Sequence, residues 1–427
     1  MKRFVLIAII HASFGLGFAQ TQTIKLSPSQ IEVLFIKQNL SLIAEKMNID
    51  IADAEIAQAK LWENPNLSID DLNFWSSEGQ RNGEEIPPLF GSFGRNMEFS
   101  AELSQLIPMG GKIKKLVERE KVSKEITIQQ FEEVLRELKT NLRKSVQEII
   151  YSQSYYNVLK NQHESFTKLI EGYKNQVAQG NLPKNELLRL QSGLLELENE
   201  MNEEQITLNE QMRVLKSLLH ADPFVSIEIV TIEPETKDPN DLSLQHLFDL
   251  MKENRPDMKI SNLQTQYFEK ALSYEKSQRI PDLTLSASYD RWGGVWRDYV
   301  GVGISMDLPL LNRNRGNIRA AVLGRDQSQY VAKQQENEAQ QELVEAYNNY
   351  AISYKFYKKI VADNLLSELD QMLDVYTKNL LKRNISIVEY TDFMEAYKSN
   401  KQTILNARKN RYIKFEELQN IVGTDIK

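Results

Sequence analysis

Residues 281–290 read PDLTLSASYD, and residues 299–309 read YVGVGISMDLP. In both stretches apolar side chains alternate with polar or small ones, which is the period of a β-strand with two unlike faces. Each stretch is about as long as a tilted strand must be to cross a membrane. The two stretches therefore predict a membrane-spanning β-hairpin.

A hairpin cannot cross a bilayer alone, because its edges would leave N–H and C=O groups without partners in hydrocarbon. The first half of the chain offers a second pair of strands. One begins at Pro65 and alternates imperfectly around Asp70 and Asp71; the other spans about 97–108 with regular alternation. Four strands are too few to enclose an aqueous barrel, so closure requires several chains, and three would supply twelve strands.

The composition predicts that helices fill most of the remainder. Among 427 residues there are only 18 Gly and 12 Pro, which is low for an all-β protein. The formal net charge is −7, and it becomes about −9 once the two basic residues of an export signal are removed, which argues against a nucleic-acid partner. The absence of cysteine excludes disulfides, thiolate metal sites and an acylated N-terminal cysteine.

Residues 1–19 have the pattern of a signal peptide. A basic start, Met1-Lys2-Arg3, precedes an apolar run over 4–10 and small residues at Gly17 and Ala19, so we expect cleavage near Ala19/Gln20. The alternative is a buried N-terminal helix or a membrane anchor, but the apolar run is short for a spanning helix. Export without disulfides is typical of a bacterial envelope protein.

Two long helical hairpins follow the strand pairs. Residues 111–178 contain no proline and carry a seam of apolar or aromatic side chains at alternating three- and four-residue steps, which is typical of a coiled coil. Such a helix would be about 100 Å long. It breaks at 180–183 and a returning helix follows. A counterpart over about 318–382 breaks at 383–386. The seam consists of Tyr156, Leu159, His163, Phe166, Ile170, Tyr173 and Val177.

The two halves of the chain correspond to each other. Pro65 corresponds to Pro281, and five positions across the first helix turn match five across the second at one offset. The linker between the halves is either a belt outside the main helices or an ordinary connection. The predicted organisation is a signal peptide at 1–19, a first repeat at 20–222 with strands about 65–75 and 97–108 and a helical hairpin about 111–220, a linker at 223–240, and a second repeat at 241–427 with strands about 281–291 and 299–309 and a helical hairpin about 313–422.

These features resemble the TolC family of outer membrane efflux proteins over nearly the whole mature length. The resemblance rests on the duplicated strand starts, the stretch LIPMGGK at 106–112, the stretch LPLLNRNRGNIRAA at 308–321, and the paired helix turns. The last string is closest in look to the heavy-metal cation efflux branch. The chain departs from many relatives in lacking a lipidation cysteine.

The resemblance implies a mainly α-helical fold with a β-barrel part, assembled as a homotrimeric channel-tunnel of a 12-stranded barrel and an α-helical barrel. It implies a location in the bacterial outer membrane, with the helices projecting into the periplasm. The expected partners are a periplasmic adaptor protein and an inner-membrane pump of the RND type. The expected function is passive conduction of metal cations or drugs out of the cell. The alternative is a periplasmic coiled-coil scaffold or adaptor-like protein without a channel.

Three sets of residues are candidates for functional roles. Gly180, Asn181, Arg383 and Asn384 lie at the helix turns, where the family's tip docks the adaptor, although glycine and asparagine there also simply permit left-handed backbone. Acidic residues near the second turn would form rings in a symmetric lumen, or would be ordinary solvated charges; they are Asp370, Asp374, Glu389 and Asp392. Trp75, Trp292 and Trp296 would form an aromatic girdle at the membrane surface, or would pack within loops.

Basic residues follow the strands in both halves, where they would meet lipid phosphates or form a solvated helix face; they are Lys112, Lys114, Lys115, Arg313, Arg315 and Arg319. We expect no protein metal site and no cofactor, because the mature histidines, His163, His220 and His246, are widely separated. His163 is on the coiled-coil seam and is expected in the core. No phosphate-binding loop or nucleophile motif is present, so we expect no enzymatic activity.

Overall fold

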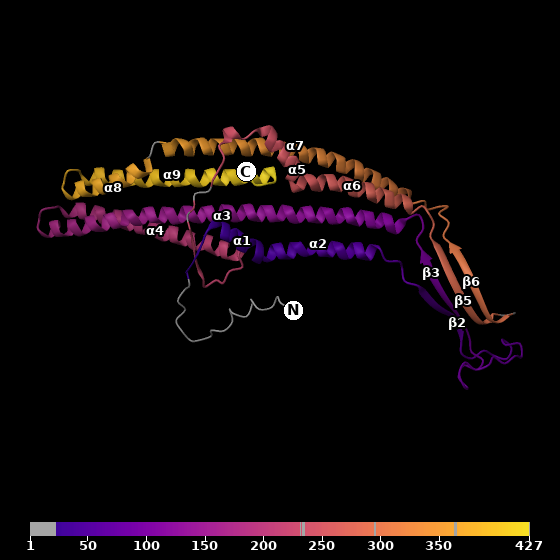
Figure 1. Cartoon of the computed structure of the whole chain (residues 1–427). Coiled ribbons are helices and arrows are strands. Elements are labelled where there is room, and N and C mark those ends of the chain that lie inside the picture. The colour runs from indigo at the N-terminus through magenta and orange to yellow at the C-terminus, as the bar shows by residue number, and fades with distance from the viewer. Residues whose placement is uncertain (1–22, 231, 233–234, 294–295, 363–364, 427) are drawn as a thin grey trace, which may run out of the picture. The chain divides into compact units, whose positions relative to one another are not determined.

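The computed structural model describes residues 23–426 except 231, 233–234, 294–295 and 363–364, so the predicted signal peptide lies outside the described residues. The described part is rich in helix (Figure 1). Its elements in order are β1 (Thr23–Leu26), α1 (Pro28–Gln38), α2 (Leu40–Ala59), β2 (Asn66–Asn73), β3 (Glu98–Ile107), α3 (Lys112–Ala178), α4 (Lys184–Leu218), β4 (Ser226–Ile229), the 3₁₀ turn η1 (Pro239–Asp241), α5 (Leu244–Asn254), α6 (Pro256–Ser277), β5 (Leu283–Gly293), β6 (Trp296–Met306), α7 (Arg315–Ala362), α8 (Leu365–Leu381) and α9 (Ile387–Val422).

The chain divides into two compact units, and each draws on both halves of the sequence. The helical unit comprises the described parts of 1–43, 135–249 and 342–427, and the sheet unit comprises 44–134 and 250–341. The long helix α3 contributes to both. Among the described residues, no helix offers an apolar stretch long enough to span a membrane.

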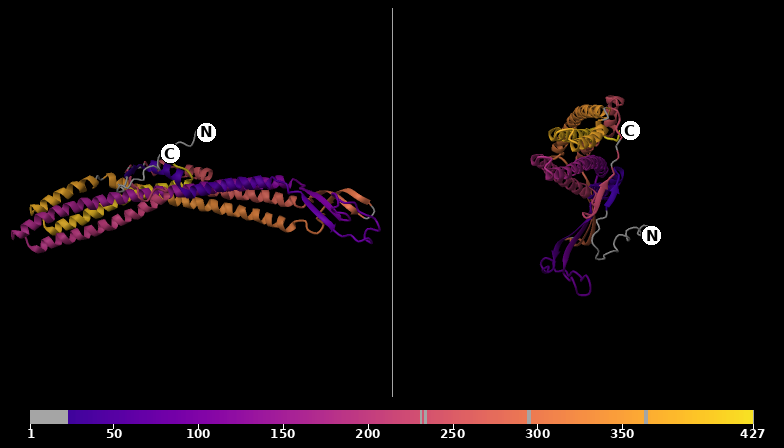
Figure 2. Two further views of the ribbon diagram at one scale, coloured as in Figure 1. Left: turned by 90° about the horizontal axis from the view of Figure 1, so that it is seen from below. Right: turned by 90° about the vertical axis from the view of Figure 1, so that its left-hand side faces the viewer.

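The sheet unit contains one antiparallel four-stranded sheet in the order β2-β3-β5-β6. Its strands are the indigo and orange ones in the left view of Figure 2. One row of paired residues runs across it from Leu67 through Leu103 and Ala287 to Val302. The register of β2 shifts between Asp70 and Asn73, the region where the sequence alternates imperfectly. β2 and β6 are the edge strands.

The helical unit contains two antiparallel helix pairs, α3 with α4 and α8 with α9, together with a small parallel sheet in which β1 pairs with β4 (Figure 1). The linker is tied to α7 through the hydroxyl of Tyr347, which donates to the carbonyl of Pro239 at 3.0 Å, and through an ion pair between Lys358 and Asp238 at 3.1 Å. The linker therefore has defined contacts along one helix.

Apolar residues recur at three- and four-residue steps over 29–62 and predict one helix there, but the structure interrupts this helix at Asn39. Its side-chain amide donates to the carbonyl of Leu218 at 2.9 Å, and its side-chain oxygen accepts from the N–H of Leu42 at 3.0 Å. The buried Asn39 thus ends α1 and starts α2 while it binds the end of α4. The periodicity continues across this position, so the break could not be seen in the apolar pattern.

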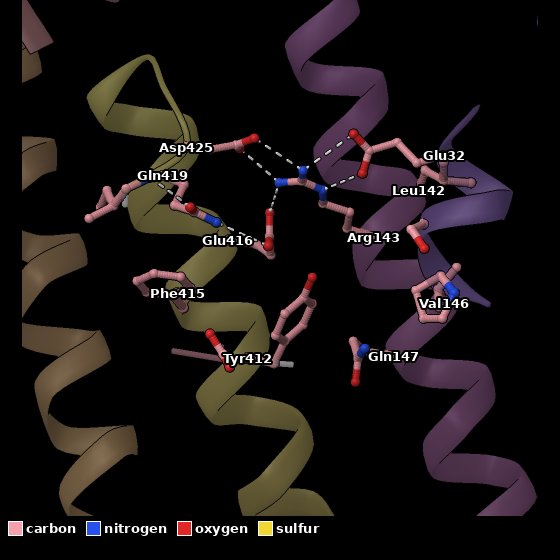
Figure 3. A pocket seen from close by; sticks show the side chains of 14 residues that line it. Glu32, Leu142, Arg143, Val146, Gln147, Tyr412, Phe415, Glu416, Gln419 and Asp425 are labelled. Atoms are coloured by element: carbon pink, nitrogen blue, oxygen red, sulfur yellow. Dashed lines mark hydrogen bonds and ion pairs between the residues drawn. The ribbon is translucent and has the colours of Figure 1, made fainter. Parts of the chain in front are cut away.

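A charge cluster joins three helices that are far apart in the sequence (Figure 3). The guanidinium of Arg143 on α3 contacts Glu32 on α1 at 3.0 Å, and Glu416 on α9 and Asp425 beyond it at 2.9 Å each. Lys139 adds a contact of 3.1 Å to Asp425. Burial opposes ionisation of Asp425, but its bonds to Arg143 and Lys139 outweigh burial and lower its pKa to about 2.

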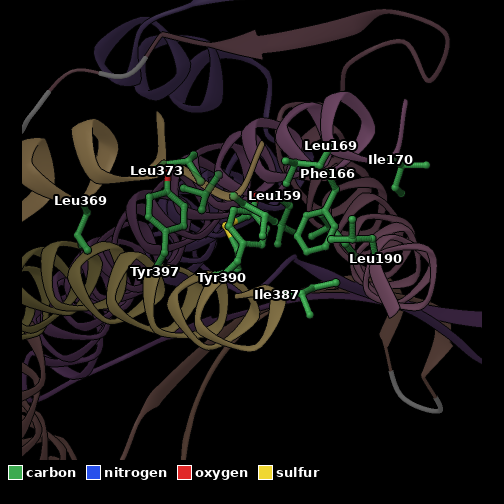
Figure 4. Close-up of a cluster of buried hydrophobic side chains, with 14 of the residues drawn as sticks. Leu159, Phe166, Leu169, Ile170, Leu190, Leu369, Leu373, Ile387, Tyr390 and Tyr397 are labelled. Atoms are coloured by element: carbon green, nitrogen blue, oxygen red, sulfur yellow. The ribbon is translucent and has the colours of Figure 1, made fainter. Parts of the chain in front are cut away.

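An apolar core is shared by α3, α4, α8 and α9 (Figure 4). Tyr390 is fully buried and meets the ring of Phe166 edge-on, with the ring centroids 5.8 Å apart. Leu159 and Leu190 are also fully buried. A helix in a protein gains most of its stability from tertiary packing of its apolar face. The shared core provides this packing and holds the two helix pairs together.

The charge cluster predicts a loss of stability in acid. A carboxylate whose pKa is lower in the folded state than in the unfolded state stabilises folding at neutral pH, and this contribution is lost as the pH falls from about 4 to about 2. The side chain of Asp425 is 50% exposed, so we expect only about 1 kcal/mol after solvent screening. Thermal unfolding across this range should show a steeper loss of stability for the wild type than for Asp425→Asn. Equal slopes would contradict this role.

The shared core predicts that Leu159→Ala lowers the free energy of unfolding by about 2–5 kcal/mol, because it opens a cavity among fully buried side chains. The neighbouring exposed residue offers a matched control, Lys160→Ala, for which we expect a change within about 0.5 kcal/mol. Thermal unfolding followed by circular dichroism would measure both, and a similar effect of the two substitutions would refute the assignment.

Candidate functional site

The two turns between paired helices use related hydrogen bonds. After α3, Gly180 has φ +76° and the N–H of Asn181 donates to the carbonyl of Gln176 at 2.8 Å. After α8, Arg383 has φ +60° and the N–H of Asn384 donates to the carbonyl of Asn379 at 2.9 Å. The left-handed residue of the second turn is therefore Arg383. The interpretation that the asparagines are present for left-handed backbone is wrong, because neither adopts it.

The structure brings the four predicted tip residues together. The guanidinium of Arg383 donates to the carbonyl of Asn181 at 2.7 Å, which joins the two turns directly. Gly180, Asn181, Arg383 and Asn384 are all exposed. The turns thus form one continuous polar surface at the end of the helical unit, which we call the tip.

Two of the four predicted acidic residues have partners within the chain. Glu389 caps the start of α9, and hydrogen bonds from the N–H and hydroxyl of Ser386 lower its pKa. Asp370 accepts from the hydroxyl of Tyr397 at 2.9 Å. Asp374 and Asp392 are exposed and form no hydrogen bond or ion pair with other described residues. Their charges therefore remain available to solvent.

Asp370 is also paired with Lys401, which is not among the predicted site residues. Its side chain is only 4% exposed, and its ammonium lies 2.6 Å from the Asp370 carboxylate and over the ring of Tyr397. Burial, together with the hydrogen bond to Asp370, raises the pKa of Tyr397. A lysine in the apolar seam that contains Tyr390, Tyr397 and Ile404 was the signal that could have identified this ion pair.

The two faces of the four-stranded sheet differ in chemistry. One face carries apolar side chains across all four strands, and Val302 on β6 is 90% exposed. The opposite face is polar or small along most of its length, and Leu106 and Tyr299 are large side chains on it. Paired rows of the first face are Leu67, Leu103, Ala287 and Val302, then Ile69, Ala101, Tyr289 and Val300; the corresponding rows of the second face are Asn66, Ser104, Ser286 and Gly303, then Ser68, Glu102, Ser288 and Gly301.

Small residues on the polar face are required by close packing. A β-carbon at Gly303 would lie 2.5 Å from the hydroxyl of Ser286, and one at Gly301 would lie 2.9 Å from the ring of Tyr299. The ring of Tyr299 therefore lies over Gly301. This face is covered by small polar groups and aromatic edges within the sheet.

The three tryptophans differ in their surroundings. Trp75 and Trp296 are largely exposed, as a membrane girdle requires. Trp292 is half-buried under the guanidinium of Arg297, which lies 4.4 Å from its ring and also contacts Glu84. Trp292 therefore packs within the hairpin rather than standing free.

The basic residues after the strands also divide into two kinds. Lys112 is buried, and its ammonium lies 2.7 Å from the carboxylate of Asp282 at the start of β5. It is a structural residue and neither meets lipid nor forms a solvated face. Lys115 is half-buried, and the others, Lys114, Arg313, Arg315 and Arg319, are exposed.

The histidine on the coiled-coil seam is not in the core. His163 is half-buried and faces Glu198 at 3.3 Å, whereas the adjacent Gln162 is buried and donates to the carbonyl of Met394. The prediction of a core histidine was wrong, because α3 presents Gln162 to α9 instead. Within the described ranges, no group of three or more metal-ligating side chains is placed to hold a metal ion.

Comparison with known proteins gives one family and one fold. Residues 247–424 match the model of the outer membrane efflux protein family. No curated protein sequence matches the chain.

Several solved structures share the fold over most of the chain. CusC has a TM-score of 0.72 and 16% identity, over 97% of this chain and 96% of its own. CmeC, the outer membrane channel of Campylobacter jejuni, has a TM-score of 0.74 and 15% identity, over 94% and 86%. VceC, an outer membrane protein of Vibrio cholerae, has a TM-score of 0.71 and 15% identity, over 94% and 97%.

The matched segment contains β5, β6 and the helix turn of the tip, which are the elements that carried the resemblance in the sequence. The fold of the relatives extends over both strand pairs and both helix pairs. Residues 247–424 therefore match the outer membrane efflux protein family, and the described chain shares the fold of solved outer membrane channels.

Proposed function

We propose that the protein is the outer membrane channel of a tripartite efflux system. It conducts substrates passively, while an inner-membrane pump of the RND type supplies the energy and a periplasmic adaptor joins the two. The observation that carries this proposal is the four-stranded sheet, which exposes a continuous apolar face and ends in two unpaired edges.

The two faces of the sheet fit a wall between lipid and water. Leu67, Val300 and Val302 are largely exposed on one face, and burying them in water-free surroundings is favourable. Ser286, Ser288 and Glu102 on the other face suit a water-filled lumen. A water-soluble scaffold would have no use for this arrangement, which favours the channel over the coiled-coil alternative.

The two edges require further copies of the chain. β2 and β6 each present unpaired N–H and C=O groups, and such groups are not tolerated in hydrocarbon. If β6 of one copy pairs with β2 of the next, three copies close a barrel of twelve strands. The same symmetry would surround one axis with the helix pairs of three copies and form the α-helical barrel of a homotrimeric channel-tunnel.

The tip is the proposed docking surface for the adaptor. Its four residues, Gly180, Asn181, Arg383 and Asn384, are exposed, and the bond from Arg383 to Asn181 makes one surface from two turns. A polar surface that is rigid before binding loses little entropy when a partner docks. The tip would then receive substrate from the adaptor and pump.

Acidic rings near the tip are the proposed selectivity and gate element. Asp374 and Asp392 are exposed and unpaired within the described chain, so three copies would bring six carboxylates near the axis if they face the lumen. Such rings attract cations, and their mutual repulsion would oppose narrowing of the tip. Glu389 and Asp370 contribute less, because each is held by neighbours in its own chain. The cargo would be metal cations or drugs.

This proposal predicts a cation-selective conductance in planar bilayers. Asp374→Ala/Asp392→Ala removes two charges per chain, so the cation preference should fall, and the conductance should rise if the rings narrow the pore. A matched control is Asp241→Ala/Glu253→Ala, which removes two exposed acids of η1 and α5 and should leave selectivity unchanged.

Native mass spectrometry of the same samples would establish whether the protein is a trimer. Absence of conductance from a monomeric protein that fractionates as soluble would refute the channel and leave the scaffold. If the variant Asp374→Ala/Asp392→Ala keeps the same cation selectivity as the control variant, the acidic rings are refuted and the channel is not.

A further inference from the structure

Two strongly apolar segments are exposed at the same end of the sheet. Leu61 and Trp62, which precede β2, are 62% and 57% exposed, and Leu310, which follows β6, is 70% exposed. Its neighbours Leu308 and Leu311 are also exposed. Asn66 at the start of β2 lies in the same paired row as Gly303 near the end of β6, so both segments leave the sheet at one end.

These segments cannot cover each other within one chain. They flank opposite edges of a four-stranded sheet, so three strand spacings of about 4.8 Å, roughly 14 Å in all, separate them. Exposed leucine and tryptophan at this density indicate a surface that is covered in the assembled protein.

The middle of the sheet contains a junction of the same kind that is already closed. Where β3 leads into α3 and α6 leads into β5, the backbone at Gly110 packs so closely on Ile280 that a β-carbon would lie 2.6 Å from its side chain. Asp282 accepts from the N–H of Met109 at 2.8 Å and pairs with Lys112 at 2.7 Å. An apolar contact and an ion pair thus hold this inner junction together.

The edge segments carry the corresponding groups. In the alignment of the two halves, Leu308-Pro309 corresponds to Ile107-Pro108, so Arg313 occupies the place of Lys112. Arg313 is exposed and forms no ion pair with the described residues. The side chain of Glu63, next to Trp62, is likewise exposed without an ion pair among them. The two edge segments therefore both carry exposed apolar side chains. They also carry opposite charges, Arg313 on one segment and Glu63 on the other.

We propose that the segment 308–313 of one copy packs on residues 61–63 of the next copy, with the leucines on Leu61 and Trp62 and with Arg313 facing Glu63. This inference rests on the proposed trimer and names a contact that holds it. Each copy offers one segment and receives the other, so the contact is heterologous and is satisfied everywhere only when the ring closes. We call this contact the junction clasp.

The position of the loop favours a second copy over lipid as the occupant. Leu308, Leu310 and Leu311 line a hollow together with Thr284, Ser305 and Asp307. Thr284 and Ser305 belong to the polar face of the sheet, because they alternate with Leu285 and Ile304 of the apolar face. The loop therefore leans toward the polar side, away from the face that lipid would cover.

The chain contains no cysteine, so a thiol-specific cross-linker would react only with the cysteines that are introduced. We would combine Leu61→Cys or Trp62→Cys with Leu310→Cys or Leu311→Cys, giving four double variants, and treat the purified full-length protein with a short bismaleimide. Covalent dimers and trimers on a denaturing gel are expected for at least one of them. The single variants should stay monomeric, as should a matched control, Leu195→Cys/Leu311→Cys, which uses an exposed leucine of α4.

Charge reversal gives a second readout that does not need new thiols. Arg313→Glu should lower the temperature at which the trimer dissociates, and Arg313→Glu/Glu63→Arg should restore it. If the dissociation temperature falls in Arg313→Glu and is not restored in Arg313→Glu/Glu63→Arg, the proposed ion pair is contradicted.

The outcomes separate this inference from the channel itself. A trimer that conducts but gives no cross-link in any double variant overturns the junction clasp and leaves the proposed function intact. Quenching of a fluorophore on Leu311→Cys by quenchers within the bilayer would place the loop in lipid and also overturn it. A protein that forms no trimer by native mass overturns both.

Discussion

The structure depends on one constraint, which is that backbone N–H and C=O groups need partners wherever water is excluded. The four-stranded sheet satisfies this requirement in its interior, where β3 and β5 are paired on both sides, and leaves it unmet along β2 and β6. Its apolar face makes exposure to water unfavourable as well. A single chain therefore leaves the two edges of its sheet without hydrogen-bond partners, and this is the physical basis of the proposed assembly of copies.

In the helical unit, long helices are held at fixed positions relative to one another. Individual helices gain little from intrinsic propensity, so their arrangement depends on packing. The core around Tyr390 and Leu159 joins the two helix pairs, and Arg143 links α1, α3 and the segment after α9. Polar contacts such as Lys401 with Asp370 fix particular side chains within this packing. The position of the tip therefore depends on the apolar core and the ion pairs inside the helical unit.

The regular patterns in the sequence predicted much of this. Strands appear where side chains alternate, and the β2 irregularity falls at Asp70 and Asp71, where the alternation fails. Other features left no trace in the pattern. Asn39 interrupts a periodic helix because its side chain finds the carbonyl of Leu218, and His163 lies outside the core because Gln162 faces α9. Both depend on a partner that is distant in the sequence.

The elements, their order and the two-faced strands could be predicted from the sequence, because periods of two and of three to four residues are local properties of the chain. Which charged side chains have partners within the chain depends on how the helices and strands pack. Lys112, Asp370 and Glu389 look like free surface charges in the sequence, yet each is held by a partner, whereas Asp374, Asp392 and Arg313 remain exposed. A pairing between residues far apart is set by how the helices and strands pack, and that information is not local.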